Sequence, residues 1–410
     1  MGIPVMRTST RALATRVKTV APEHLGERAA DLFGERFGTV PDGVWIAPGR
    51  ANLIGEHIDY TGAKTMPFAL PYATAVAVRV HSHDRLRVAS TAYEDVWEGA
   101  ASEVEPGHPN GWPAYVAGVP WAMTYHDTIA RMPGLDIAVH SSVPEGAGLS
   151  SSAALESAVA LAIAELFGAA TDDAGRRTLA RDCVTAENIV AGAATGGMDQ
   201  SVALRARQGQ VMLLDCSSFA VEYLSLDLAA AGLALLVINT NAPHRLVDGG
   251  YALRRSTVER VWSGIGCAAV SEGTDIDEVL RRAAVDDPML TGALRHVLTE
   301  IRRVDAVAAL LRAGELAAIG SHLTASHASL RDDLVVSSVE LDCAVAAALA
   351  AGALGARMIG GGFGGSVLAL VRLDHIGLTM ESVRRAAHDA GLPEPDFLHA
   401  TPSGAARRVC

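Results

Sequence analysis

Apolar and polar positions alternate with a period of two in several short stretches of this 410-residue chain. The alternation predicts β-strands at 73–80 and 135–141. Short apolar runs predict further strands at 210–215, 233–239 and 366–373. Apolar residues at helical spacing predict helices from the serines near 150 onward and over 174–191, 249–263, 302–319 and 337–351. Because strands and helices do not alternate regularly, the pattern favours an α+β fold over a doubly wound sheet.

The length of the chain suits two to three domains at about 150 residues each. The first twenty residues carry Arg7, Arg11, Arg16 and Lys18 without an apolar run, which indicates a flexible N-terminal extension over 1–20 rather than a secretory signal. The remainder is expected to divide into an N-terminal domain, 21–215, and a C-terminal domain, 216–410. No Pro- or Gly-rich linker marks the boundary.

Composition narrows the classes of function. Half of the residues are hydrophobic, and the net charge is −12, so a basic surface for nucleic acid is not expected. The longest uncharged stretch of the Ala-rich region, 343–356, is too short to span a bilayer. Five scattered cysteines suggest neither a disulfide framework nor a zinc site, and favour a reducing cytoplasm.

One short segment, GRANLIGEHIDY at residues 49–60, gathers an unusual variety of hydrogen-bonding side chains. They are Arg50, Asn52, Glu56, His57, Asp59 and Tyr60. A purely structural loop rarely needs so many different groups. From the residues alone the segment can bind a metal ion, bind a polyhydroxylated ligand, or form a solvated turn.

Three further segments combine glycines with polar groups. Residues 143–166 place glycines and three serines before an amphipathic helix, which suits phosphate binding at a helix N-terminus or, equally, a serine-capped helix. Residues 187–200 carry Glu187 and Asp199, which either divide the work of metal ligand and proton acceptor or are solvated acids at helix ends. Residues 355–371 include five closely spaced glycines, at 360–362, 364 and 365, between a predicted helix and a predicted strand, which favours close backbone approach or an anion nest.

Together these segments resemble the GHMP family of small-molecule kinases and, within it, the galactokinases. GRANLIGEHIDY is similar to the galactokinase sugar motif, PEGAGLSSSAA to the ATP loop, GGMDQ to the segment with the catalytic aspartate, and GARMIGGGFGG to the third glycine motif. Residues 239–255 and 326–342 also resemble galactokinase segments. The resemblance runs from about Ala21 onward and implies a two-domain α+β architecture with the active site in the cleft between the domains.

The resemblance implies that galactose is held by Glu56, His57 and Asp59, with Gly196 and Tyr251 completing the pocket. Charged acceptors in a dry pocket make strong, directional hydrogen bonds and reject a sugar whose hydroxyl points elsewhere. Ile58 stands where threonine is commoner and is expected to adjust the pocket wall. A metal site built from the same carboxylates and histidine would leave the nearby cation of Arg50 unexplained.

For catalysis the resemblance implies that Asp199 is the general base and that Arg50 keeps it ionised and stabilises charge during phosphoryl transfer. The residues that it places around ATP and Mg²⁺ are Gly146, Ala147, Gly148, Leu149, Ser150, Ser151 and Ser152 at the phosphates, Trp112 and Tyr115 near the adenine, and Ser152 with Glu187 as metal ligands. Trp112 and Tyr115 equally suit core aromatics on one helical face. Ser366 stands where a cysteine is common.

The expected activity is transfer of the γ-phosphoryl group of MgATP to the anomeric O1 of D-galactose. A kinase for galacturonate, N-acetylgalactosamine or L-arabinose is the alternative enzyme, and a galactose and ATP sensor without turnover is the alternative of another class. Neither nucleic acid nor a membrane is expected as a partner, and a monomer is favoured.

Overall fold

A six-stranded sheet organises the first half of the chain in the computed structural model, which describes residues 21–242, 247–265, 275–283 and 287–410. The predicted extension over 1–20 lies outside these residues. In spatial order the strands are β13 (Arg407–Arg408), β1 (Gly43–Asn52), β3 (Pro67–His81), β6 (Gly134–Ser141), β4 (Leu86–Ser90) and β5 (Trp97–Gly99). All neighbours are antiparallel except β4 and β6.

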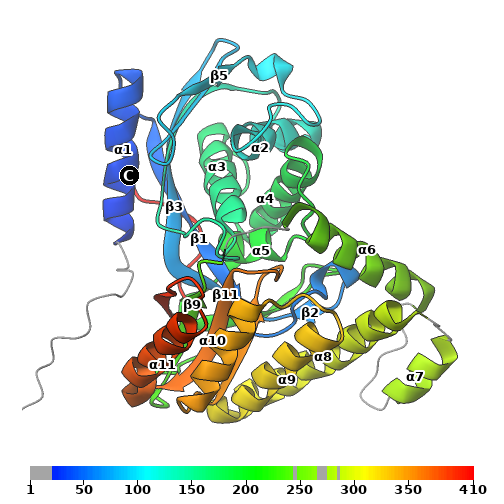
Figure 1. The fold of residues 1–410 in the computed structure, drawn as a ribbon. Coiled ribbons are helices and arrows are strands. Elements are labelled where there is room, and N and C mark those ends of the chain that lie inside the picture. The colour runs from blue at the N-terminus through cyan, green and yellow to red at the C-terminus, as the bar shows by residue number, and fades with distance from the viewer. Residues whose placement is uncertain (1–20, 243–246, 266–274, 284–286) are drawn as a thin grey trace, which may run out of the picture.

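Helices cover both faces of this sheet (Figure 1). Alternate residues of β1 face opposite layers. Trp45 and Ala47 belong to the hydrophobic cluster on one face of the sheet, whereas Val44 and Ile46 belong to the cluster on the other face. The first face is covered by α2 (Pro113–Tyr125), α3 (Ser151–Phe167), α4 (Asp173–Thr185) and α5 (Met198–Arg205). The opposite face is covered by α1 (Pro22–Phe37). Every residue of β1 is buried, as expected for a strand between two layers.

A second, four-stranded sheet is antiparallel throughout. Its spatial order is β10 (Gly355–Ile359), β11 (Ser366–Arg372), β9 (Leu233–Asn239) and β12 (Asp396–Ala400). The helices packed against it are α9 (Ile319–Asp332), α10 (Val339–Ala350) and α11 (Ile376–Asp389). Helix α8 (Pro288–Ala313) packs on α9, and α6 (Val247–Ile265) and α7 (Ile276–Ala283) pack on α8. The mixed architecture confirms the predicted α+β class.

A small third sheet joins the two halves. It contains β2 (Lys64–Thr65), β7 (Gln210–Asp215) and β8 (Val221–Ser225) in that order. Because β7 and β8 pair with each other, the predicted boundary after residue 215 falls in the turn of a hairpin. Strand β13 lies beyond residue 400 and yet pairs with β1, so residues 407–408 belong with the first sheet.

The predicted strands are all present, but one predicted helix has different limits. The helix expected over 302–319 begins fourteen positions earlier as α8, where the Asp287 carboxylate accepts a hydrogen bond from the Met289 N–H at the helix start. It ends at Ala313 because Gly314 adopts a left-handed conformation (φ 75°). Short helices cover Asp59–Thr61 (η1), Ala101–Glu103 (η2), Ala186–Val190 (η3), Leu316–Ala318 (η5) and Leu373–His375 (η6).

Among the described helices, none is both long and apolar enough to cross a membrane.

Candidate active site

The loop over residues 53–58 follows β1 and carries two of the polar side chains singled out in the sequence. Pairing between β1 and β3 shifts between Pro48 and Arg50, and such a bulge re-aims the side chains that follow it. The Glu56 carboxylate accepts hydrogen bonds from the Asn52 side-chain amide and from the Gly360 N–H. Glu56 is therefore held both by its own segment and by the glycine-rich turn after β10.

His57 is fixed by a partner at each ring nitrogen. Its Nδ1 lies 3.1 Å from the Tyr60 hydroxyl, and its Nε2 lies 3.2 Å from the Gly361 carbonyl oxygen. Because a carbonyl oxygen only accepts, Nε2 carries the proton and Nδ1 accepts from Tyr60. Burial, together with the neighbouring His296 and other charges, lowers the pKa of His57 to about 3. The ring is therefore neutral at physiological pH.

An ion pair between Arg50 and Asp199 joins two motifs that are 149 positions apart. The guanidinium donates from Nε to Oδ1 of Asp199 at 2.8 Å and from the terminal nitrogen to Oδ2 at 2.9 Å. Its other terminal nitrogen donates to the Gly148 carbonyl at 2.6 Å, and the Arg50 main-chain N–H donates to the Leu149 carbonyl at 3.0 Å. Arg50 thus ties the predicted base to the predicted phosphate loop.

The predicted phosphate loop precedes α3 and turns through two glycines with positive φ, Gly146 and Gly148. A Cβ added at Gly148 would lie 3.3 Å from the Ile359 carbonyl oxygen, so the loop packs backbone to backbone against the end of β10. Ser150 is left-handed, and its hydroxyl donates to Asp199 instead of capping the helix. The alternative of a plain serine-capped helix is therefore wrong for this residue.

Ser152 and Glu187 meet beside this loop. The Ser152 hydroxyl donates to Glu187 Oε1 at 3.1 Å, and the Gln200 side-chain amide donates to Glu187 Oε2 at 2.5 Å and to Glu156 at 3.1 Å. Burial, followed by the charge of Asp199, raises the pKa of Glu187 to about 7. A hydroxyl and a buried carboxylate next to a phosphate loop fit Mg²⁺, which takes few protein ligands and fills its shell with phosphate and water oxygens.

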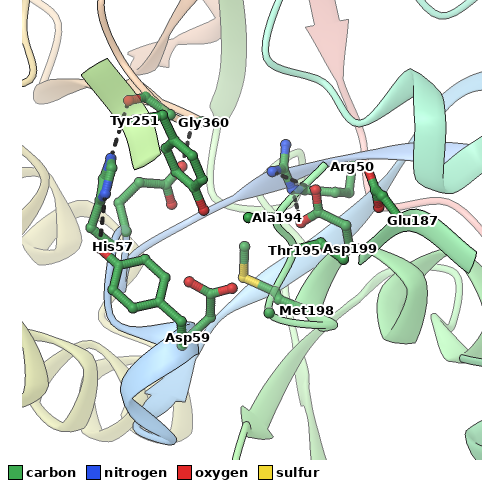
Figure 2. A pocket seen from close by; sticks show the side chains of 14 residues that line it. Arg50, His57, Asp59, Glu187, Ala194, Thr195, Met198, Asp199, Tyr251 and Gly360 are labelled. Carbon is green, nitrogen blue, oxygen red and sulfur yellow. Dashed lines mark hydrogen bonds and ion pairs between the residues drawn. The ribbon is translucent and has the colours of Figure 1, made fainter. Parts of the chain in front are cut away.

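A cavity of about 240 Å³ opens between the 53–58 loop, the turn before α5 and helix α6 (Figure 2). Asp59 points into it, and Gly196 lies so close that a Cβ there would overlap the Asp59 carboxylate. Burial, reinforced by Asp199 and Glu56, raises the pKa of Asp59 to about 6. The cavity lining includes Arg50, Glu56, His57, Asp59, Tyr60, Glu187, Gly196, Asp199 and Tyr251.

A larger cavity, of about 1700 Å³, adjoins the first and shares Arg50, Asp199 and Tyr251 with it. Its lining contains the glycine loop and both aromatic residues singled out in the sequence, Trp112 and Tyr115. The Trp112 ring stacks on Tyr93 with centroids 5.0 Å apart and planes 3° from parallel. Sequence spacing gave no signal for Tyr93, which lines the cavity from the turn after β4.

Two predicted contact residues lie outside both cavity linings. The Ile58 side chain is fully buried in the hydrophobic core and does not line the cavity that Asp59 faces. The prediction that Ile58 shapes the pocket wall is therefore corrected. Ala147 is also buried, and its carbonyl accepts a hydrogen bond from Ser366 at 2.7 Å. Ser366 thus steadies the phosphate loop from β11.

The alternative interpretation of residues 49–60 as a metal site, with Glu56, His57 and Asp59 as ligands, finds no support in the geometry. Within the residues that the structure describes, no group of three or more His, Cys, Asp and Glu side chains is arranged to hold a metal ion. Glu56 is already engaged by protein donors, and both nitrogens of His57 have protein partners. The carboxylates of Glu56 and Asp59 line the small cavity, where their remaining lone pairs can accept from the hydroxyls of a polyhydroxylated ligand.

Comparison with known families matches three parts of the chain. A model described as the galactokinase galactose-binding signature matches residues 31–80, the GHMP kinase N-terminal domain matches 114–207, and the GHMP kinase C-terminal domain matches 306–389. Among solved structures, a galactokinase of Lactococcus lactis complexed with galactose superposes with a TM-score of 0.85 at 27% identity, over 93% of this chain and 99% of the other. A mevalonate kinase of Methanococcus jannaschii shares the fold, with a TM-score of 0.59 at 15% identity, over 88% of this chain and 98% of the other.

Curated relatives extend the likeness over nearly the whole chain. A galactokinase of Streptomyces coelicolor is 42% identical over 394 residues, which cover 94% of this chain and 100% of the relative. A galactokinase of Bos taurus is 38% identical over 374 residues, which cover 88% of this chain and 92% of the relative. On these matches, the chain belongs to the galactokinase family of GHMP kinases.

Proposed function

We propose that this protein transfers the γ-phosphoryl group of MgATP to the anomeric hydroxyl of D-galactose, giving α-D-galactose 1-phosphate and ADP. The observation that carries the proposal is the Arg50–Asp199 ion pair, which lies where the small acidic cavity meets the larger glycine-lined one. A sugar in the first cavity would present a hydroxyl to Asp199, and a nucleotide in the second would present its terminal phosphate to the same place.

In this proposal Asp199 accepts the proton of the attacking hydroxyl. Burial lowers the pKa of Arg50, but the charges of Asp199, Glu56 and Asp59 raise it above its ordinary value, so the guanidinium stays charged. Its bidentate bond fixes the orientation of the Asp199 carboxylate. Phosphoryl transfer depends mainly on positioning and charge neutralisation, so a carboxylate fixed beside the attacking hydroxyl is a sufficient base.

The nucleotide would lie along residues 146–152, with Trp112 and Tyr115 near the base. Ser152 and Glu187 would hold Mg²⁺, whose chemistry is to neutralise charge on the phosphate oxygens. The backbone N–H groups at the start of α3 favour the same anionic groups. A cytoplasmic location, which the scattered cysteines favour, and a monomeric state are also part of the proposal.

Charge in the small cavity favours a neutral hexose over an acidic one. Glu56, Asp59 and Asp199 face this space, and its cation, Arg50, is already paired. A galacturonate carboxylate would meet like charges in a poorly hydrated site, which is unfavourable. An ADP-release assay over galactose, glucose, galacturonate, N-acetylgalactosamine and L-arabinose should give the highest kcat/KM with galactose. A higher value with another sugar would reassign the substrate, and binding without turnover would favour a sensor.

Replacing Asp59 with alanine should weaken galactose binding by about ten- to a hundred-fold, because hydrogen bonds to a charged acceptor contribute about 1.5–3 kcal/mol. Calorimetry without nucleotide measures this directly. Affinity for a non-hydrolysable ATP analogue should not change. Asp31→Ala, at an exposed position on α1, serves as the control. Unchanged galactose affinity in Asp59→Ala would remove this residue from the sugar site.

The raised pKa of Asp59 gives that prediction a pH dependence. The carboxylate is ionised above about pH 6 and protonated below it. Galactose affinity of the wild type should therefore be full above pH 6 and fall as the pH drops through that value. In Asp59→Asn the affinity should be weaker and flat over the same interval. A wild-type profile that stays flat from pH 5 to pH 7 would contradict the role of the ionised form.

Substitutions at the proposed metal ligands should change the Mg²⁺ requirement and leave sugar binding intact. Glu187→Gln and Ser152→Ala each remove one oxygen ligand or its charge, so the Mg²⁺ concentration for half-maximal activity should rise about tenfold or more. Galactose affinity measured without nucleotide should match the wild type. Loss of galactose affinity with an unchanged Mg²⁺ requirement would assign both residues to the sugar site instead.

A further inference from the structure

Two side chains of helix α8 hydrogen-bond the backbone of the 53–58 loop, one at the Gly55 N–H and one at the Glu56 carbonyl. The Gly55 N–H donates to Glu300 Oε1 at 2.9 Å, and His296 Nε2 lies 3.0 Å from the Glu56 carbonyl oxygen. Because a carbonyl oxygen only accepts, His296 carries its proton on Nε2 and donates it. The two α8 residues are four positions apart, so they lie on one face of the helix, one turn from each other.

His296 and Glu300 are both fully buried, and each has further hydrogen-bond partners in the protein. Glu300 also accepts from the Ser326 hydroxyl at 2.8 Å and from Arg303 Nε at 2.6 Å, and His296 Nδ1 lies 3.0 Å from the Ser329 hydroxyl. Burial raises the pKa of Glu300, but the charges of Arg303 and other neighbours hold it at about 2. The loop N–H therefore meets an ionised acceptor, which makes a stronger bond than a neutral one.

These two hydrogen bonds hold a strained part of the backbone. His57 has a φ of 61°, a left-handed conformation that is unfavourable for a residue other than glycine. The peptide group before it is the one whose carbonyl His296 binds. Fixing that group, together with the Gly55 N–H, determines where the side chains of Glu56 and His57 point. Both side chains line the small cavity, whereas His296 and Glu300 do not.

We propose that His296 and Glu300 are positioning residues for sugar recognition, which act by holding the peptide group before Gly55 and the peptide group after Glu56. The proposal rests on the proposed function, since it takes galactose as the ligand of the small cavity. Neither helix residue needs to touch the sugar. Their effect is to keep two sugar-facing side chains within the fraction of an ångström that directional hydrogen bonds require.

Near-isosteric pairs of variants isolate the effect. Glu300→Gln and Glu300→Met both lose the charge beside Arg303, but only glutamine keeps an acceptor for the Gly55 N–H. We expect calorimetry without nucleotide to give a galactose Kd about ten- to a hundred-fold weaker for Glu300→Met than for Glu300→Gln. Affinity for a non-hydrolysable ATP analogue should be the same in both variants.

A control on the same helix separates positioning from stability. Leu298 is fully buried on α8, and its side chain cannot hydrogen-bond the loop. Leu298→Ala should lower the melting temperature and leave the galactose Kd unchanged. If Glu300→Met lowers the melting temperature as Leu298→Ala does but binds galactose as tightly as Glu300→Gln, the positioning role is wrong.

A second pair keeps the test decisive if Glu300→Met does not fold. His296→Gln retains an N–H that can reach the Glu56 carbonyl, whereas His296→Leu does not. Galactose should bind about tenfold more weakly to the leucine variant, and equal affinities would overturn the proposal. Absence of galactose binding by the wild-type protein would instead contradict the proposed function, so the two failures are distinguishable.

Discussion

Asp199→Asn should turn over about 10²–10⁴-fold more slowly than the wild type, the usual loss when a general base is removed. Asparagine keeps the size of the side chain and can still accept from Arg50, so the site should remain assembled. It cannot take a proton from the sugar hydroxyl. Steady-state kinetics measures the loss in kcat, and calorimetry should show that galactose and the ATP analogue still bind.

A variant that leaves the carboxylate in place is the control for this result. Ser150→Ala removes one hydrogen bond to Asp199 but neither the charge nor the Arg50 pair. Its kcat should fall far less than that of Asp199→Asn. Undiminished turnover in Asp199→Asn would show that the residue is not the base. Water would then accept the proton of the sugar hydroxyl.

Arg50→Met should lower kcat by about 10³-fold or more, within the range found when an arginine that stabilises phosphoryl transfer is lost. The substitution removes the bidentate partner of Asp199, the donor to the Gly148 carbonyl and the positive charge shared by both cavities. Unlike Asp199→Asn, it should also weaken binding of the ATP analogue, because the phosphate loop loses an anchor.

Arg50→Lys tests whether charge or shape matters. A lysine keeps the positive charge but cannot make two parallel hydrogen bonds to Asp199 and a third to Gly148. Its kcat should lie between those of Arg50→Met and the wild type. Wild-type kinetics in Arg50→Lys would mean that the fork geometry is unimportant, and wild-type kinetics in Arg50→Met would exclude Arg50 from catalysis.

Periodicity predicted the strands well because each lies between layers and reads as an apolar or alternating run. The strand at 233–239 is fully buried, and the alternation at 73–80 matches residues that face opposite sides of one sheet. Helix limits were harder. The predicted helix extends past Gly314 to residue 319. In the structure Gly314 adopts a left-handed conformation, and α8 ends just before it. The apolar periodicity continues across this glycine, so the sequence pattern does not predict the end of the helix there.

The candidate site was accessible from sequence only where its residues cluster in motifs. Arg50 and the 53–58 loop occupy one segment, so their types and order could be recognised. Partners that arrive from distant elements carry no such signal. Tyr93 stacks on Trp112 from a loop after β4, and Arg357 donates to the Asn52 carbonyl at 3.1 Å from β10. Only the packing of the sheets determines that these residues meet.

The partners of Glu56 have a consequence for the order in which the chain folds. Its carboxylate is bound by a main-chain N–H 304 positions further on, and its carbonyl by a side chain 240 positions further on. Closing loops of this length is slow relative to forming local helices and hairpins. On the ribosome, the 53–58 loop must wait until α8 and β10 have been synthesised and docked. Galactose can therefore stabilise only the completed molecule, by mass action on the native state, and cannot assist any earlier pairing of β1, β3 and β6.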